Sequence, residues 1–566
     1  NNYRTQKFTN NGSVSLAGIN STFAYIDMPT TKGYDTKYGT SVGVPGIEAS
    51  NGNGDTDANS NGWVIENTKK LDISGTGNTG IFVNDNFKYW AAQITLNPST
   101  VTLGGTGNAG VYFKGWADLD GGAVLNGEAS GNGTSSASTF NMEVSGSGNA
   151  GLYFNYSKDD SSTTKDTFKL TGTSTMEAGG NGNILIYNGN GDIDVSNAFN
   201  LITNGLNNVA IYNASADKFV TKATISGTGT EAVGIYSKGT GETTNTGNIT
   251  LTANKVKGIV SDGSGAVINN NGGTVKVEGQ EVAGAIAMNS GVVNIGKTTG
   301  PSNIEAKGKS GLGVYATSSG EVNIGDSTIK SENGAVNVYS NGGDINLGVN
   351  GKTTTVQVGA NSLGFMQIGS KKVNFVGTTN ANIEENGTAF YIAPSSIPST
   401  VSYPSSIASL GSGYTGWTNL TLKMGKNSNV VVASYVDTKL SDLDLTTVGI
   451  PATRIVDNSG GAGYKDFLLY KSKLTIDSPK TYADYKKISL SSSSIINDTT
   501  ISSNDDDVKL MAQENDDTNA ANKWVKLENN KTIELNGKNS VAMYASDGTI
   551  KNNAGAKITM GGKNSV

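Results

Sequence analysis

Residues 71–83 read LDISGTGNTGIFV, and the same thirteen-residue pattern returns at residues 101–113 as VTLGGTGNAGVYF and at residues 142–154 as MEVSGSGNAGLYF. Every copy contains a Gly-Asn pair, one further residue, and a central Gly followed by three apolar residues. Looser copies lie at residues 225–236, 251–260, 277–286, 304–315, 356–366 and 533–544. The central Gly is most closely spaced at Gly234, Gly258 and Gly284, which are 24 and 26 residues apart. A period of roughly 20 to 50 residues is typical of solenoids, propellers and arrays.

Each repeat contains short runs in which apolar and polar residues alternate, such as TVKVE at residues 274–278. Alternation predicts half-buried strands, and Gly-Asn, Asn-Gly and Gly-Gly pairs between them predict turns. Three short strands with three turns need about 20 to 27 residues at the rise of a strand, which matches the period. We therefore predict an all-β fold, a right-handed parallel β-helix with side insertions. The alternative is a set of antiparallel β-sandwich domains, but a repeat of this length is too short for one.

The composition agrees with a narrow core and excludes several chemistries. Of 566 residues, 76 are Gly and only 35% are hydrophobic, while His and Cys are absent. Without His or Cys there is no Ser-His-Asp system and no zinc, haem or iron–sulfur site of the usual kinds. With only Arg4 and Arg454 as arginines and a formal net charge of −6, nucleic acid is an unexpected partner. We expect no catalytic residue, no metal and no cofactor.

The regularity of the repeat suggests how the chain is organised. We expect an irregular or capping segment at residues 1–70, coils with loop insertions at 71–392, a projecting proline-rich insertion or subdomain at 393–530, and resumed coils at 531–566. No stretch approaches the roughly 18 apolar residues of a membrane-spanning helix, and residues 1–10 lack the apolar core of a signal peptide. We interpret the chain as a processed or excised piece of a longer protein.

Four insertions begin at one point of the repeat, directly after its apolar run, at residues 84–93, 114–122, 155–165 and 213–218. Stacked coils would bring them together on one edge, where aromatic planes beside carboxylates suit galactose-type sugars. The residues predicted to bind a ligand are Tyr89, Trp90, Trp116, Asp118, Asp120, Tyr156, Asp159 and Asp160. The alternative is that the tryptophans only cap the loops against the coils.

A Tyr recurs at one position of the repeat, and in-register coils would stack these rings into a ladder. Its members are Tyr112, Tyr153, Tyr187, Tyr212, Tyr236, Tyr315, Tyr339 and Tyr544. Such a ladder could bind sugars, but it runs along the whole chain rather than at one place. This favours a structural role.

Several runs resemble the passenger of a type Va autotransporter: GNAGVYF at residues 107–113, EAVGIY at 231–236, GLGVY at 311–315 and GKNSVAMYA at 537–545. Within that class they look most like the large fusobacterial outer-membrane adhesins of the RadD-like or galactose-inhibitable kind. The resemblance covers residues 71–391 and 533–566. It implies an extracellular passenger at the bacterial surface, attached to the outer membrane by a C-terminal β-barrel outside this chain. The ligands it implies are galactose-type glycans, inhibitory immune receptors or other bacteria.

Three functions fit these observations to different degrees. The first is a non-catalytic adhesin that presents loops to a host glycan, a receptor or a partner bacterium. The second is a structural spacer of a larger autotransporter. The third, an enzyme that cleaves polysaccharides, needs paired carboxylates such as Asp118 with Asp120 or Asp192 with Asp194, and no supporting residues accompany these pairs.

Overall fold

The computed structural model describes residues 7–28, 63–67, 69–85, 92–95, 99–116, 124–125, 139–157, 168–170, 172–298, 300–394, 396–478, 487–514 and 524–566. The chain divides into two compact units. The first is Asn1–Glu305 with Gly320–Asn323, and the second is Ala306–Ser319 with Ile324–Val566. Nearly all regular structure in the described residues of both units is parallel β-strand.

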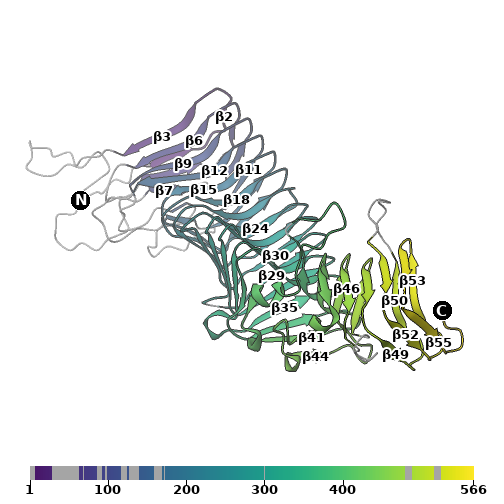
Figure 1. Ribbon diagram of the computed structural model, residues 1–566. Helices are drawn as coiled ribbons and strands as arrows, with labels where there is room; N and C mark the ends of the chain where they lie inside the picture. Colours follow the sequence, from purple (N-terminus) through teal and green to yellow (C-terminus); the bar gives the residue numbers. More distant parts are fainter. Residues whose placement is uncertain are drawn as a thin grey trace, which may run out of the picture. The chain divides into compact units, whose positions relative to one another are not determined.

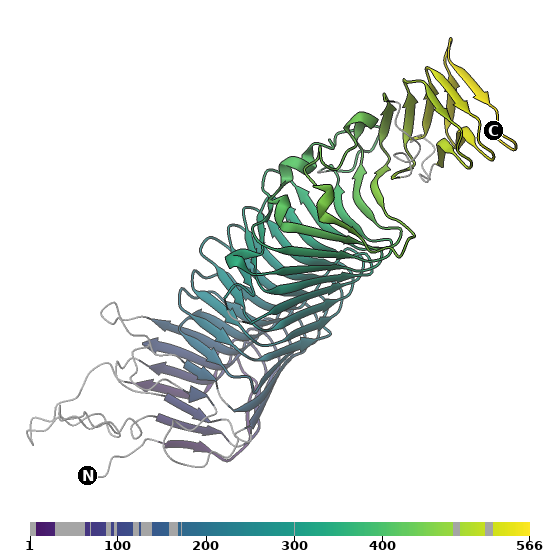
Figure 2. The same cartoon turned by 90° about the horizontal axis from the view of Figure 1, so that it is seen from below.

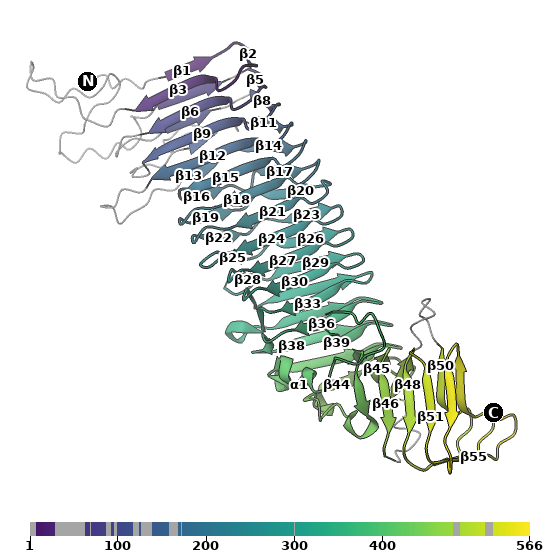
Figure 3. The same cartoon turned by 45° about the horizontal axis from the view of Figure 1, so that its top comes forward.

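In the first unit every third strand belongs to the same parallel sheet, so three consecutive strands make one coil (Figure 1). Sheet A contains β1 (Lys7–Asn10), β4 (Trp63–Asn67), β7 (Ala92–Thr95), β10 (Val124–Leu125), β13 (Phe168–Leu170), β16 (Ile193–Val195), β19 (Phe219–Thr221), β22 (Glu242–Asn245), β25 (Val267–Asn270) and β28 (Val292–Ile295). Sheet B contains β2 (Val14–Leu16), β5 (Leu71–Ile73), β8 (Ser99–Leu103), β11 (Thr139–Val144), β14 (Thr173–Ala178), β17 (Phe199–Thr203), β20 (Thr224–Gly227), β23 (Ile249–Thr252) and β26 (Thr274–Glu278). Sheet C contains β3 (Thr22–Met28), β6 (Thr79–Asp85), β9 (Ala109–Trp116), β12 (Ala150–Ser157), β15 (Ile184–Asn190), β18 (Val209–Asn213), β21 (Val233–Ser237), β24 (Lys257–Asp262) and β27 (Ala283–Met288). The strands of sheet C lie side by side in Figure 3, and the parallel β-helix is confirmed.

The second unit repeats this arrangement with further parallel sheets, whose last strands are drawn in yellow in Figure 2. Sheet D contains β34 (Asp344–Leu347), β37 (Val373–Phe375) and β40 (Tyr414–Thr415); sheet E contains β32 (Ser327–Glu332), β35 (Thr354–Val358), β38 (Thr379–Ile383), β41 (Leu420–Met424) and β44 (Ile455–Asp457). Sheet F contains β30 (Leu312–Thr317), β33 (Val336–Asn341), β36 (Leu363–Ile368), β39 (Thr388–Ile392), β42 (Asn429–Ser434), β45 (Lys465–Tyr470) and β47 (Ile488–Ser491). Sheet G contains β43 (Asp437–Lys439), β46 (Lys473–Ile476), β48 (Ser494–Asn497), β51 (Lys526–Asn529) and β54 (Thr549–Asn552); sheet H contains β49 (Ile501–Ser503), β52 (Thr532–Leu535) and β55 (Lys557–Met560); sheet I contains β50 (Lys509–Glu514) and β53 (Val541–Ser546).

The remaining regular elements are two strands and a few single helical turns. The strands β29 (Ser302–Lys307) and β31 (Glu321–Ile324) each contain residues of both units. The helical turns are η1 (Val349–Gly351), α1 (Ser409–Gly413), η2 (Trp417–Asn419), η3 (Leu440–Asp442) and η4 (Ala452–Arg454).

The coils extend further along the chain than the repeat pattern predicts. Strands β1, β2 and β3 pair in parallel with β4, β5 and β6, so coils are already present at Lys7 and the expected irregular segment at residues 1–70 is corrected. Residues 29–62 lie outside the described part of the chain. Within residues 393–530, β41 pairs with β38, and β42 pairs with β39 and β45. These strands add coils to the second unit, so the prediction of a projecting subdomain there is wrong.

The core consists of the apolar side chains that alternate along the strands. In β5 both Leu71 and Ile73 are buried, with Asp72 between them partly exposed. Aromatic rings stack from coil to coil inside the first unit, where the rings of Phe113 and Phe154 lie 4.8 Å apart and parallel. Each coil thus buries its apolar face against the coils above and below it, which accounts for a stable core at this low hydrophobic content.

The central Gly of the repeat is required by close packing. A Cβ atom at Gly258 would lie 2.2 Å from Cγ1 of Val275 and 2.4 Å from the carbonyl oxygen of Gly284. Neither contact is possible for a real side chain without moving the backbone. The Gly therefore lets sheet C lie close to sheet B.

The Asn of the Gly-Asn pair forms a buried ladder that sequence analysis interpreted only as a turn signal. The backbone N–H of each Asn donates to Oδ1 of the Asn in the next coil, at 2.7 Å from Asn78 to Asn108 and 2.8 Å from Asn108 to Asn149. The ladder continues through Asn183 and Asn208. Each side-chain Nδ2 also donates to the carbonyl oxygen four residues earlier, as Asn149 does to Ser145 at 2.6 Å. The ladder thereby satisfies backbone groups that the turn would otherwise bury unpaired.

Candidate binding surfaces

The strands that precede the first three insertions are neighbours in sheet C. The backbone register pairs Asp85 of β6 with Gly115 of β9, and Gly115 with Tyr156 of β12. Because adjacent parallel strands that end at the same register end at one edge of the sheet, the insertions that follow them leave from one edge. The predicted common starting point of these loops is therefore confirmed at the level of the backbone.

The predicted ligand-binding residues themselves lie almost entirely beyond what the structure describes. The backbones of Trp116 and Tyr156 belong to the ends of β9 and β12, where Trp116 is the register partner of Ser157. The side chains of these two residues lie outside the described part, as do all atoms of Tyr89, Trp90, Asp118, Asp120, Asp159 and Asp160. The aromatic and acidic patch accordingly stays a prediction.

The fourth insertion, residues 213–218, does not project as a loop, so that expectation is wrong. Asn213 and Ser215 are fully buried. Oδ1 of Asn213 accepts from Nδ2 of Asn188 at 3.0 Å, and its Nδ2 donates to Oγ1 of Thr243 at 2.9 Å. The hydroxyl of Ser215 accepts from the backbone N–H of Gly191 at 3.0 Å. This segment is short enough for its polar side chains to be satisfied by neighbouring coils, and it forms a closed corner.

The tyrosine ladder on sheet C is confirmed in the first unit as a stack from Tyr153 to Tyr236, which Tyr112 joins edge to face at 4.7 Å from Tyr153. Ring centroids lie 4.6 Å apart for Tyr153 and Tyr187, 5.3 Å for Tyr187 and Tyr212, and 5.1 Å for Tyr212 and Tyr236, with interplanar angles of 17°, 10° and 16°. Burial raises the pKa of the Tyr153 and Tyr212 hydroxyls, and the neighbouring Tyr187 adds to this. From Tyr153 to Tyr236, the ring faces that meet cover each other and cannot also stack on a sugar. The geometry supports the structural interpretation.

One end of this stack is fixed by a carboxylate. The hydroxyl of Tyr236 donates a hydrogen bond to Oδ2 of Asp262, and Nδ2 of Asn289 donates to Oδ1 of Asp262 at 2.7 Å. Burial, together with this hydrogen bond, raises the pKa of Tyr236. The phenol therefore stays a neutral donor, and both oxygens of Asp262 are satisfied within the protein.

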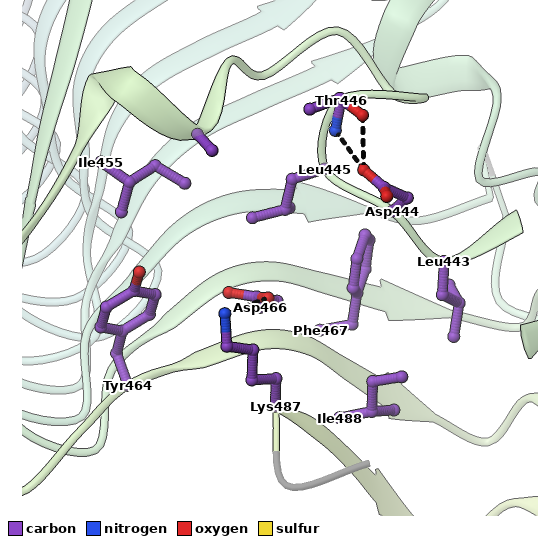
Figure 4. Close-up of a pocket in the computed structure, with 11 residues that line it drawn as sticks. Leu443, Asp444, Leu445, Thr446, Ile455, Tyr464, Asp466, Phe467, Lys487 and Ile488 are labelled. Atoms are coloured by element: carbon purple, nitrogen blue, oxygen red, sulfur yellow. Dashed lines mark hydrogen bonds and ion pairs between the residues drawn. The ribbon is translucent and has the colours of Figure 1, made fainter. Parts of the chain in front are cut away.

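A cavity of about 290 Å³ lies in the second unit, between the turn that follows η3 and the strands β44, β45 and β47 (Figure 4). Its lining combines apolar and polar side chains from these elements. The lining residues are Leu443, Asp444, Leu445, Thr446, Ala452, Ile455, Tyr464, Asp466, Phe467, Lys487 and Ile488. No motif in the sequence marks this place, and sequence analysis missed it. The signal available was an acidic residue, Asp466, at the position where other repeats carry the central Gly.

Charged groups meet in the middle of this cavity. Nζ of Lys487 lies 3.7 Å from Oδ2 of Asp466, whose side chain is only 17% exposed. Oδ1 of Asp444 accepts from the backbone N–H and the hydroxyl of Thr446, at 2.8 and 2.6 Å. Burial raises the pKa of Asp466 most, Lys487 opposes this, and the negative charge of Asp444 adds to the rise. The pKa of Tyr464 is also raised by burial, with contributions from Asp466 and Asp457.

The described residues contain no group of three or more acidic side chains placed to hold a metal ion. None of their helices is both long and apolar enough to cross a membrane. No protein-family model, no curated protein and no solved structure matches the chain.

Proposed function

We propose that the chain is part of a non-catalytic surface adhesin that binds cell-surface glycans or protein receptors through loops held on a β-helical scaffold. The partners we propose are host cells, with galactose-type glycans or inhibitory immune receptors, and other bacteria. The proposed location is the bacterial cell surface. The single observation that carries this proposal is that β6, β9 and β12 end side by side at one edge, each followed by an insertion rich in aromatic and acidic residues.

The scaffold below this edge is suited to presenting loops. Stacked Phe113 and Phe154 fill the interior, and Asn108 and Asn149 link neighbouring turns through buried hydrogen bonds. Strand ends fixed in this way hold the starting points of three loops at constant separation. A binding surface that is already positioned loses less conformational entropy when it meets its partner.

Binding of the purified chain to a glycan array and to candidate receptors tests the proposal. Large aromatic side chains dominate binding energies, so Trp90→Ala and Trp116→Ala should each weaken binding about tenfold or more. Tyr544→Ala is the matched control, because this aromatic side chain is 50% exposed and lies in β53, outside the insertions. Unchanged binding by both folded tryptophan variants would reject the loop site.

Two alternatives predict different results in simple assays. If the chain is only a spacer, a parent adhesin that lacks this segment should adhere as well as the intact protein. If it is an enzyme, incubation with polysaccharides should release reducing sugars. Either result would replace the adhesin proposal.

A further inference from the structure

The tyrosine stack brings four phenol rings into contact along sheet C of the first unit. Tyr153, Tyr187, Tyr212 and Tyr236 are register partners on the adjacent strands β12, β15, β18 and β21 (Figure 3). Successive ring centroids lie 4.6, 5.3 and 5.1 Å apart, and neighbouring rings are within 17° of parallel. Rings at such separations are in direct contact. An electron vacancy created in one ring can therefore pass to the next.

The last hydroxyl of this stack donates to a carboxylate. The Tyr236 hydroxyl bonds to Oδ2 of Asp262 on the next strand, β24, and Nδ2 of Asn289 donates to Oδ1 of the same carboxylate at 2.7 Å. Burial, followed by the hydrogen bond to Asp262, raises the pKa of Tyr236. The phenol thus keeps its proton at neutral pH while a base stands at its hydroxyl. The negative charge of Asp262 also contributes to the raised pKa of Tyr212.

This arrangement favours oxidation at one particular ring. A phenol that loses an electron becomes a strong acid, so its oxidation is easiest where a base accepts the proton in the same step. The carboxylate of Asp262 is such a base, and its charge stabilises an electron vacancy in the rings beside it. The hydroxyl of Tyr153 bonds instead to that of Tyr187, and a neutral phenol is a far weaker proton acceptor. A vacancy formed anywhere in the stack should therefore come to rest at Tyr236.

We propose that Tyr236 is a site of oxidative modification, at which the stack delivers the vacancy left by a diffusible one-electron oxidant and Asp262 accepts the proton. One electron passes from the phenol to the oxidant, and the hydroxyl proton passes to Oδ2 of Asp262. The phenoxyl radical then forms a carbon–carbon bond, through the ring carbon beside its oxygen, with the radical that the same oxidant makes from an external phenol. The hydrogens on the two joined carbons move as protons to the two oxygens, which restores both phenols.

The second unit contains a similar pair of stacked rings without a carboxylate. The rings of Tyr315 and Tyr339 lie 5.1 Å apart with an interplanar angle of 21°. Burial and the neighbouring Tyr315 raise the pKa of Tyr339, and no carboxylate contributes to that rise. This pair matches the first stack in ring contact and differs from it in the proton acceptor. Tyr339 is therefore the internal reference for Tyr236.

Photo-oxidation of the full chain with tris(bipyridine)ruthenium(III), generated by light and persulfate, tests the proposal. N-acetyltyrosine amide is the external phenol, and mass spectrometry of tryptic peptides locates the adducts. Tyr236 is the only tyrosine of the peptide at residues 223–238, and Tyr339 is the only one at residues 331–352. The first peptide should carry about tenfold more adduct than the second. Equal labelling of the two peptides would overturn the proposal.

Variants separate the proton acceptor from the stack. Asp262→Asn keeps the shape and removes the base, and should lower labelling of Tyr236 about 10- to 100-fold. Asp326→Asn is the matched control and should leave it unchanged, because Asp326 is exposed and belongs to the second unit. Tyr236→Phe should raise labelling of the peptide at residues 170–218, which contains Tyr187 and Tyr212, because the vacancy then stays on those rings.

Far-ultraviolet circular dichroism checks that each variant is folded. Unchanged labelling of Tyr236 in folded Asp262→Asn, or no rise at residues 170–218 in Tyr236→Phe, would refute the assignment. The site is independent of the adhesin proposal. Tyr236→Phe should leave adhesion unchanged, and Trp90→Ala and Trp116→Ala should leave the labelling of Tyr236 unchanged.

Discussion

Replacing Asn149 by Ala would remove one rung of the buried asparagine ladder and leave the strands on either side unchanged in sequence. In the native protein Oδ1 of Asn149 accepts from the backbone N–H of Asn108 at 2.8 Å, and Nδ2 donates to the carbonyl oxygen of Ser145 at 2.6 Å. Asn149 is 1% exposed and Asn108 is 2% exposed. Water is therefore poorly placed to take over the lost contacts.

The expected effect follows from the two groups left without partners. A buried donor or acceptor that loses its hydrogen bond destabilises the folded state by about 1 to 3 kcal/mol. The carbonyl of Ser145 is only partly buried, so we expect a total of about 2 to 4 kcal/mol rather than the full sum. Because a solenoid coil contacts mainly its neighbours, the loss should appear as local opening around β11 and β12.

Hydrogen exchange followed by mass spectrometry on peptides within residues 139–157 measures that opening. We expect exchange about 30- to 1,000-fold faster in Asn149→Ala, since each tenfold corresponds to about 1.4 kcal/mol. Ser147→Ala is the matched control, because Ser147 is exposed and lies two residues away in the same turn. Equal exchange rates in the two variants would show that the ladder does not hold the coils together.

Two further predictions concern packing and charge. Gly258→Ala should destabilise the first unit by about 1 to 3 kcal/mol in urea unfolding, because the new Cβ would meet Val275 and Gly284. Gly12→Ala, where the nearest contact is 3.7 Å, should change stability by less than about 0.5 kcal/mol, and equal effects would contradict the packing argument. Asp466 has a raised pKa in the folded state, so its contribution to folding is full at low pH and is lost as the pH rises through that value. Asp466→Asn should thus raise the free energy of unfolding at pH 7, with a gain that shrinks toward about pH 4; a gain that grows on acidification would refute this.

Sequence alone was sufficient to predict the parallel coils, because the central Gly and the alternating apolar residues have a physical cause that repeats in every coil. It could not locate where the coils begin. Thr22 and Thr79 are register partners in adjacent strands, yet 57 residues separate them, so a period search does not connect them. Between β39 and β40 the chain likewise runs through residues 393–413, which hid the coils that follow.

The asparagine ladder and the surroundings of Asp466 depend on which residues of neighbouring strands lie opposite each other. A single sequence does not show this register. The sequence pattern of a Gly-Asn pair is the same whether the Asn is exposed in a turn or, like Asn149, buried in a ladder. Likewise, nothing in the sequence Lys465-Asp466 indicates burial, and only the structure shows that the Asp466 side chain is 17% exposed. The first three insertions were found from their common starting point, and their backbone origin at one edge agrees with that reasoning.

The most direct test of the account measures distance against coil number within the first unit. Thr22, Ala150, Val209 and Lys257 occupy one register position of sheet C, and the last three lie three, five and seven coils from Thr22. Spin labels on cysteines at Thr22 paired with each of the other three should report about 14, 24 and 34 Å, because each coil adds ~4.8 Å. Distances that rise steadily with coil number support the stacked coils and the shared loop edge, and distances that do not increase in this order would contradict both.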